Sequence, residues 1–206
     1  SRNQNRKIYG WNNEPFLDLY QSNYNKKDGI YSQPKPISEL NSIYHEGPLT
    51  MTEDGKTIYF SSESFNEKLF DNDKVRKIKF GQVNLYKATD NDGKWTNITP
   101  LPFNSKSYSV SNPSISKNGE ILYFASNMPG TLGGLDIWKV SVKADGSFGN
   151  PENLGANVNT SQDESFPFIA DDNVLYFSSK GLGGLGGFDI YSVDSVSYTH
   201  LRAHET

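Results

Sequence analysis

Hydrophobic and polar positions alternate along this chain in short runs, three of which end in Tyr-Phe followed by small residues. Alternation with a period of two is typical of a strand that has one buried face. Two of the runs also contain Asp54-Gly55 or Asn118-Gly119, which are dipeptides that tight hairpin turns favour. Each run therefore predicts a β-hairpin, and the three are "PLTMTEDGKTIYFSS" (48–62), "PSISKNGEILYFAS" (113–126) and "PFIADDNVLYFSS" (167–179).

Two more kinds of run recur at fixed distances from these hairpins. One is a strand-like run with a central aromatic residue, and it occurs at 16–22, 82–88, 134–140 and 187–193. The other is an Asp-Gly turn, an aromatic residue two positions later and a polar, proline-containing strand, and it occurs at 27–37, 91–101 and 144–154. Tyr123 and Tyr176 lie 53 positions apart, as do Trp138 and Tyr191. The repeating unit is therefore four strands in about 53 residues.

A four-stranded unit in tandem predicts an all-β fold, a β-propeller fragment of four-stranded antiparallel blades. A β-sandwich also has many short strands, but it does not usually repeat a four-strand register. An α/β fold is disfavoured because no segment outside one insertion shows the 3.6-residue apolar period of a helix. Because four or more blades normally close a ring, we expect a piece of a larger propeller. The predicted parts of this partial propeller (1–195) are the outer strands of one blade (14–40), two blades (41–104 and 105–158) and an incomplete blade (159–195).

The insertion lies at 63–81, inside the first complete blade. Its mixed charges are typical of a solvated segment. Its apolar residues could form one amphipathic turn, or the segment could extend two strands into a longer hairpin. We interpret it as a candidate contact surface, with Lys74, Arg76 and Lys77 as its candidate residues.

The last eleven residues, Val196 to Thr206, break from the pattern. They resemble the translation of a transposase-type sequencing adapter, so we interpret 196–206 as a non-native tail outside the fold. This interpretation also removes His200 and His204, whose i, i+4 spacing would otherwise suggest a zinc site on a helix.

Composition excludes several classes of protein. The net charge is −4 among 206 residues, which gives no basic face for nucleic acid. The chain has no cysteine, so disulfides, thiolate metal sites and cysteine nucleophiles are excluded. No apolar run approaches the roughly 20 residues that span a bilayer, so we expect no membrane span in this segment. The start has no initiator Met and no signal-like apolar stretch, which suggests a chain cut from a longer one.

The repeats "LYFSS", "GGLDIWKV" and "PENLGANVNT" together resemble the WD40-like propeller repeat related to the TolB propeller, over about residues 10 to 195. The variant here is similar to the propellers of OmpA-family envelope proteins of Gram-negative bacteria, some of which are components of type IX secretion. The resemblance implies a scaffold in the periplasm, associated with the outer membrane, whose partners are other envelope proteins. Peptidoglycan contact would belong to a domain absent from this chain.

Aligned acidic residues enter the third strand of each unit, and a shared function for them is conceivable. A short polar side chain that bonds the nearby backbone explains them better, so we interpret them as structural. They are Asp18, Asp136 and Asp189, with Asn84 in the remaining unit.

Glycine-rich stretches precede the same strands. "GLGGLG" (181–186) has the GxGxxG spacing of a nucleotide-binding loop, but a β-rich run follows where such a loop needs a helix. We therefore predict flexible links that turn the chain or contact a partner. The candidate interaction residues are Gly130, Gly133, Gly134, Gly183, Gly184, Gly186 and Gly187.

The sequence gives little support for a catalytic site or a metal site. No GxSxG motif occurs, and His45 is the only histidine before the tail. The acidic stretch at 89–94 fails the calcium-loop spacing, and we interpret it as a turn. His45-Glu46 matches Asp163-Glu164 in the loop before a first strand, which could be a ligand surface or a cap. We predict no enzyme, no catalytic residues, no cofactor and no metal site.

The function predicted from these observations is a non-catalytic protein-interaction scaffold of the cell envelope. The alternative is a carbohydrate-binding or hydrolytic propeller. Carboxylates and aromatic side chains gathered at the ring axis would favour that alternative.

Overall fold

The computed structural model describes residues 15–63, 70–73, 78–196 and 202–204. All regular structure in this part of the chain is β-strand, and no helix occurs among these residues. The strands form three four-stranded antiparallel sheets, as the repeats predict. The predicted fold class, a β-propeller fragment of four-stranded blades, is confirmed.

Each blade is a meander in which consecutive strands pair, apart from the inserted ribbon in the first. The first blade consists of β5 (Glu46–Met51), β6 (Thr57–Glu63), β9 (Val83–Asn91) and β10 (Lys94–Pro100). The second blade consists of β11 (Val110–Ile115), β12 (Ile121–Ser126), β13 (Asp136–Ser141) and β14 (Glu152–Asn153). The third blade consists of β15 (Glu164–Ile169), β16 (Val174–Ser179), β17 (Asp189–Asp194) and β18 (Arg202–His204).

Three two-stranded ribbons complete the structure. β1 (Tyr20–Gln21) pairs with β4 (Lys35–Pro36), and β2 (Tyr24–Asn25) pairs with β3 (Ile30–Tyr31). In the insertion, β7 (Phe70–Asp73) pairs with β8 (Ile78–Gly81), as the longer-hairpin interpretation expects, and the amphipathic-turn interpretation falls mostly on residues outside the described ones. Lys74, Arg76 and Lys77 lie outside the described residues.

The tail has one unexpected feature. Arg202–His204 forms β18 and pairs with β17, although we expected 196–206 to take no part in the fold. The outer edge of β17 presents main-chain N–H and carbonyl groups that need hydrogen-bond partners. β18 supplies these partners in the place of a fourth strand. The adapter origin of the tail stays a prediction.

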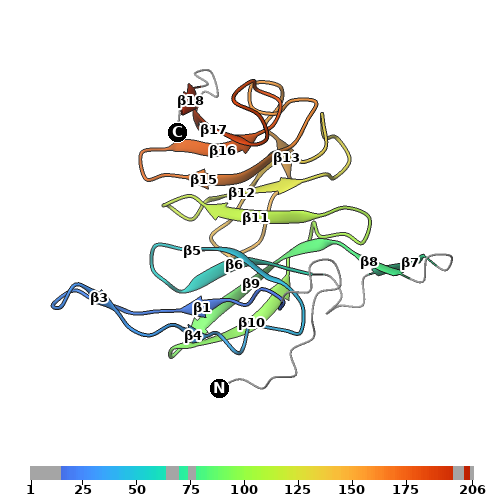
Figure 1. Ribbon diagram of the computed structural model, residues 1–206. Helices are drawn as coiled ribbons and strands as arrows, with labels where there is room; N and C mark the ends of the chain where they lie inside the picture. The colour runs from blue at the N-terminus through green and yellow to red at the C-terminus, as the bar shows by residue number, and fades with distance from the viewer. Residues whose placement is uncertain (1–14, 64–69, 74–77, 197–201, 205–206) are drawn as a thin grey trace.

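The blades follow one another through the molecule, with β1 and β4 at one end and the third blade at the other (Figure 1). The first strand of the second blade, β11, contacts both β5 and β15. The first strands of the three blades are therefore neighbours, as they are around a propeller axis.

Hydrophobic clusters fill the junctions between blades. Consecutive residues of a second strand face opposite junctions, so Phe124 belongs to the junction of the first and second blades and Tyr123 to that of the second and third. Phe124 stacks on Phe103 with ring centroids 5.1 Å apart. Each blade therefore depends on its neighbours for its core.

Candidate functional site

The glycine-rich loop of the second blade lies between β12 and β13 and contacts the next blade. The Gly134 N–H donates to the Gln162 carbonyl oxygen at 2.8 Å. A Cβ atom on Gly133 would overlap that same carbonyl oxygen, and one on Gly134 would overlap the Asp163 carboxylate. Only residues without a side chain allow this approach. Gly133 and Gly134 therefore belong to a junction between blades, whereas Gly130 lies against Trp138 of its own blade.

The corresponding loop of the third blade is placed differently. It contains Gly183, Gly184, Gly186 and Gly187 at the free end of the stack, and Leu185 between them is almost fully exposed. This loop precedes β17, whereas the loop of the second blade precedes β13. The seven candidate glycines therefore lie in two separate loops and do not form one surface.

The aspartates at the entry to the third strands hold these loops. Asp136 is fully buried and accepts hydrogen bonds from the Leu132 N–H at 2.7 Å and the Gly133 N–H at 3.3 Å. It also accepts one from the Asn153 amide at 2.7 Å. Asp189 accepts a weaker bond from the Gly186 N–H at 3.4 Å. These contacts order a turn.

Residues just before the first strands connect neighbouring blades. His45 Nδ1, Ser109 Oγ and Asp163 Oδ1 each accept a main-chain N–H from the preceding blade, at 3.0, 3.2 and 3.1 Å. The donors are Leu17, Val83 and Leu135 respectively. Burial lowers the pKa of His45, which favours the neutral ring whose Nδ1 can accept a hydrogen bond. The Lys180 ammonium, 2.8 Å away, lowers the pKa of Asp163.

The glutamates that follow two of these residues are buried and serve as local hydrogen-bond acceptors. Glu164 accepts bonds from the Thr160 N–H at 2.7 Å, the Thr160 hydroxyl at 2.8 Å and the Ser179 hydroxyl at 2.5 Å. Glu46 accepts bonds from Ser42 at 2.5 Å and Ser62 at 3.3 Å. Asp163 and Glu164 are therefore both engaged in holding the loop before β15.

Glu63, at the end of β6, has a strongly perturbed carboxyl group. Burial, and to a smaller extent the negative charge of Glu46, raises its pKa from 4.5 to about 7. The folded state therefore keeps a proton that the unfolded chain releases between pH 4.5 and 7. This contribution to stability is complete below pH 4.5 and is lost as the pH rises through 7.

We expect Glu63→Gln to stabilise the protein above pH 7 by about 1 kcal/mol, a value reduced for partial solvent screening. The difference from the unmodified protein should vanish below pH 4.5. Urea unfolding at pH 4.5, 6 and 8 measures it. An equal effect of the substitution at all three pH values would contradict the perturbed pKa.

Three asparagines that the sequence analysis did not single out stabilise the blade edges. In each, the side-chain oxygen accepts the N–H of a third-strand residue at 2.7–3.0 Å, and the side-chain amide donates to the carbonyl of that residue at 2.6–2.9 Å. The recurring Asn-Ser or Asn-Thr dipeptide after each fourth strand could have revealed them. The pairs are Asn41 with Leu19, Asn104 with Leu85, and Asn159 with Ile137.

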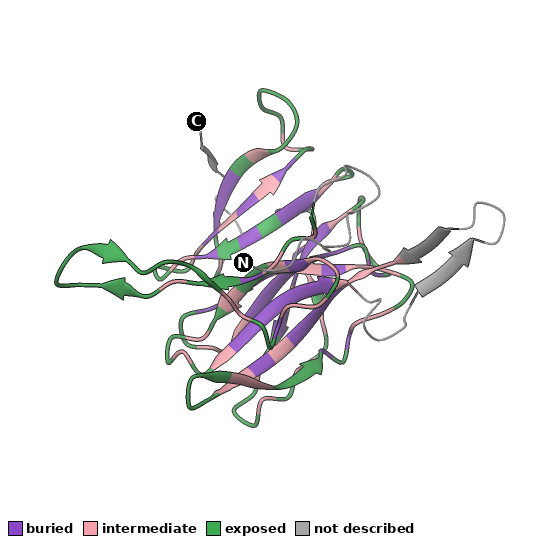
Figure 2. Ribbon diagram, turned by 60° about the horizontal axis from the view of Figure 1, so that its bottom comes forward, coloured by how far each residue is buried: buried purple, intermediate pink, exposed green. Residues whose placement is uncertain are grey.

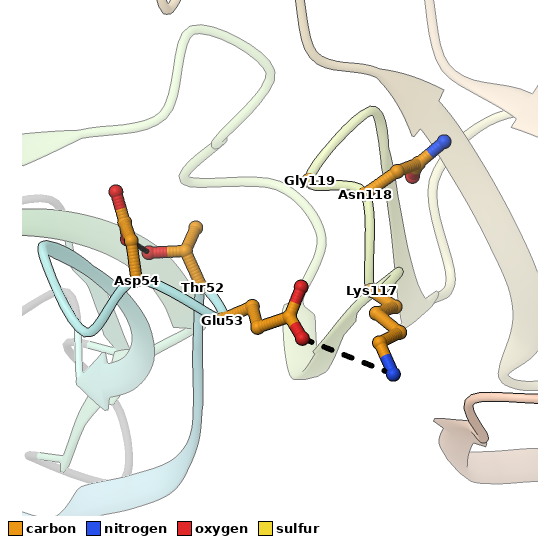
Figure 3. Close-up of a pocket in the computed structure, with 6 residues that line it drawn as sticks. All are labelled: Thr52, Glu53, Asp54, Lys117, Asn118 and Gly119. Atoms are coloured by element: carbon orange, nitrogen blue, oxygen red, sulfur yellow. Dashed lines mark hydrogen bonds and ion pairs between the residues drawn. The ribbon is translucent and has the colours of Figure 1, made fainter.

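A charged hollow of about 450 Å³ lies between the first hairpin turns of two blades (Figure 3). Its walls are Thr52, Glu53 and Asp54 from the first blade and Lys117, Asn118 and Gly119 from the second. The Lys117 ammonium lies 3.8 Å from Glu53 and 2.9 Å from Asp171 of the third blade. Lys117 therefore joins the turns of three blades, and the hydrogen bond that its ammonium donates to the Asp171 carboxylate raises the pKa of Lys117.

Among the residues that the structure describes, no three His, Asp or Glu side chains converge as metal ligands would. Asp90 accepts the N–H of Gly93 at 3.0 Å, which is a turn contact. Among these same residues, no helix is long and apolar enough to cross a membrane.

The fold defines the class of protein, a β-propeller, and solved structures agree. No protein-family model matches the chain, and no curated protein does. TolB from Acinetobacter baumannii is similar with a TM-score of 0.53 and 20% identity, over 85% of this chain and 35% of that one. A putative TolB from Agrobacterium tumefaciens is similar with a TM-score of 0.53 and 17% identity, over 89% of this chain and 59% of that one.

An enzyme shares the same architecture. A puromycin-hydrolyzing peptidase from Mycobacterium tuberculosis is similar with a TM-score of 0.51 and 16% identity, over 79% of this chain and 23% of that one. The chain spans less than two thirds of each of these three proteins. At such identities the comparison establishes a TolB-like propeller fold.

Proposed function

We propose that this chain is a non-catalytic protein-interaction scaffold of the cell envelope, located in the periplasm and associated with the outer membrane. The resemblance of its repeats to OmpA-family propellers, including those of type IX secretion, supports this location. Its partners are then other envelope proteins, and any peptidoglycan contact belongs to a further domain. The TolB-like fold supports an interaction role.

One observation carries the proposal. The side chains best suited to acid–base chemistry accept hydrogen bonds from loop main chains or from nearby hydroxyl, amide and ammonium groups. Asp136, Asp163 and Glu164 each accept at least two such bonds, and His45 accepts one. Groups used in this way are fixed in place: His45 and Asp163 connect neighbouring blades, and Asp136 and Glu164 hold loops of their own blade. The charged hollow is the better candidate for a partner contact, because Glu53 and Asp171 remain largely exposed around Lys117.

A capture experiment tests the proposal. Affinity capture from a Gram-negative envelope extract should retain specific proteins on the unmodified chain and lose them on the double variant Glu53→Lys/Asp171→Lys. The matched control is Glu152→Lys, which changes an equally exposed acid beside β13 and should leave capture unchanged. Capture that is equal on all three chains would contradict a role for the charged hollow.

The alternative, a carbohydrate-binding or hydrolytic propeller, is tested in parallel. Chromogenic glycosides and peptide substrates should give no product, and calorimetric titration with soluble glycans should give no binding heat. Turnover above the buffer rate that is lost in Asp163→Asn, or saturable glycan binding, would favour the alternative.

A further inference from the structure

The turn between β11 and β12 contains the single Asn-Gly pair of the sequence, Asn118-Gly119. An asparagine is most prone to deamidation when glycine follows it, because the main-chain nitrogen of a residue without a side chain can closely approach the asparagine side chain. The blades bury much of their strands and expose their turns (Figure 2), and Asn118 is exposed. Water, which the reaction consumes, therefore reaches this side chain.

In the closed turn, the groups that would react are hydrogen-bonded. The Gly119 N–H donates to the Ser116 carbonyl oxygen at 2.8 Å. Asn118 Oδ1 accepts the Ser116 hydroxyl at 2.7 Å and the Glu120 N–H at 3.2 Å. The Asn118 amide donates to the Glu120 carboxylate at 2.7 Å. These bonds hold the Gly119 nitrogen against Ser116, so an attack on Asn118 requires the turn to open first.

The corresponding turn of the first blade has an aspartate in this place. Asp54 Oδ1 accepts the Thr52 hydroxyl at 2.6 Å and the Lys56 N–H at 2.9 Å. Asp54 therefore corresponds to Asn118, and Lys56 to Glu120. The hydrogen bonds from Thr52 and from the Lys56 N–H, and to a smaller extent the charge of Lys56, lower the pKa of Asp54. A carboxylate thus suits this turn when a lysine follows two positions later.

The turn of the second blade has the opposite charge at that later position. An aspartate at position 118 would lose the hydrogen bond that the Asn118 amide donates and would place a second carboxylate beside that of Glu120. Two like charges so close repel each other. Lys117, the lysine of this turn, is paired with Glu53 and Asp171. The deamidated turn would therefore close less well than the original one.

We propose that Asn118 is a deamidation site, that the reaction starts from the opened turn, and that its products weaken the closed turn. The Gly119 main-chain nitrogen attacks Asn118 Cγ, and the bond from Cγ to the amide nitrogen breaks. The amide group and the proton of the attacking nitrogen leave together as ammonia, and a cyclic imide remains. Water then adds to either imide carbonyl, and the ring opens to aspartate or isoaspartate.

The product also changes the charged hollow, because Asn118 belongs to its wall. Deamidation adds one negative charge there, next to the turn of Lys117. An isoaspartate would in addition lengthen the main chain of a turn whose two ends are fixed by the pairing of β11 with β12. This inference is independent of the scaffold role.

Peptide mapping by mass spectrometry, on the purified full chain incubated at neutral pH, tests the site. Asn118 should be converted faster than Asn173, which lies in the corresponding turn of the third blade and is followed by the branched Val174. The chain unfolded in urea should be converted at least about tenfold faster at Asn118, because the turn is then open. Ser116→Ala removes a hydroxyl that holds the turn, so it should speed conversion in the folded chain and leave the rate in urea unchanged.

Hydrogen exchange tests the effect on the turn. Asn118→Asp should lower the protection of the Gly119 amide several-fold, since it removes one hydrogen bond and adds repulsion. The double variant Asn118→Asp/Glu120→Lys rebuilds the pattern of Asp54 and Lys56 and should restore the protection. Circular dichroism should show that both variants stay folded, because both replaced residues are exposed.

Three results would overturn the proposal. Equal conversion of Asn118 and Asn173 in the folded chain would overturn the site. Equal rates at Asn118 in the folded and the unfolded chain would overturn the requirement for an opened turn. Unchanged protection of the Gly119 amide in Asn118→Asp would overturn the effect of the product on the turn.

Discussion

Replacement of Phe124 by alanine is expected to lower the free energy of unfolding by about 4 kcal/mol. Phe124 is fully buried between the first and second blades and stacks on Phe103. The substitution removes that aromatic contact and leaves a cavity that neighbouring strands cannot fill, because both blades are held by their own strand pairing.

Urea unfolding followed by circular dichroism measures this loss. Phe168→Ala is the matched control, because Phe168 is an exposed phenylalanine of a first strand, and it should cost less than about 1 kcal/mol. Equal losses for the two variants would mean that the junction between the first and second blades does not stabilise the fold as described.

Replacement of Glu164 by alanine is expected to cost about 3 kcal/mol. The carboxylate is fully buried and accepts three hydrogen bonds, from Thr160 twice and from Ser179 once. Its removal leaves these donors unsatisfied in the interior, and each such group carries a desolvation penalty of about 1 kcal/mol or more.

The effect should also be local. Amide hydrogen exchange should speed up most in the loop at 160–163, which precedes β15 and contacts Gly133 and Gly134. Glu152→Ala, at an exposed acid, is the control and should change stability by less than about 0.5 kcal/mol. Unchanged stability in Glu164→Ala would show that other groups satisfy these donors.

The blade pattern could be predicted from the sequence because strands and tight turns are local features. Alternation and the turns at Asp54-Gly55 and Asn118-Gly119 fix hairpins within about fifteen residues. The insertion at 63–81 left two interpretations open, because its short apolar pattern fits a helical turn as well as a strand.

Contacts between blades could not be predicted in the same way. The sequence predicts a flexible link at Gly133 and Gly134. Glycine is required there because the Gln162 carbonyl of the next blade comes so close that a side chain would not fit. The sequence also shows that His45 and Asp163 occupy the same place in their repeats. The main-chain N–H groups that these side chains accept lie 28 positions earlier in each case. Such partners depend on how blades pack, which no local pattern encodes.

The asparagines at the blade edges act as side-chain substitutes for one more β-strand. Each covers both the N–H and the carbonyl of one third-strand residue, including Ile137 beside the two-residue strand β14. Exposed main-chain pairs of this kind are where sheets of different molecules join and aggregate. A single amide that occupies such a pair lets β14 stay two residues long without leaving an edge to which a sheet of another molecule can pair.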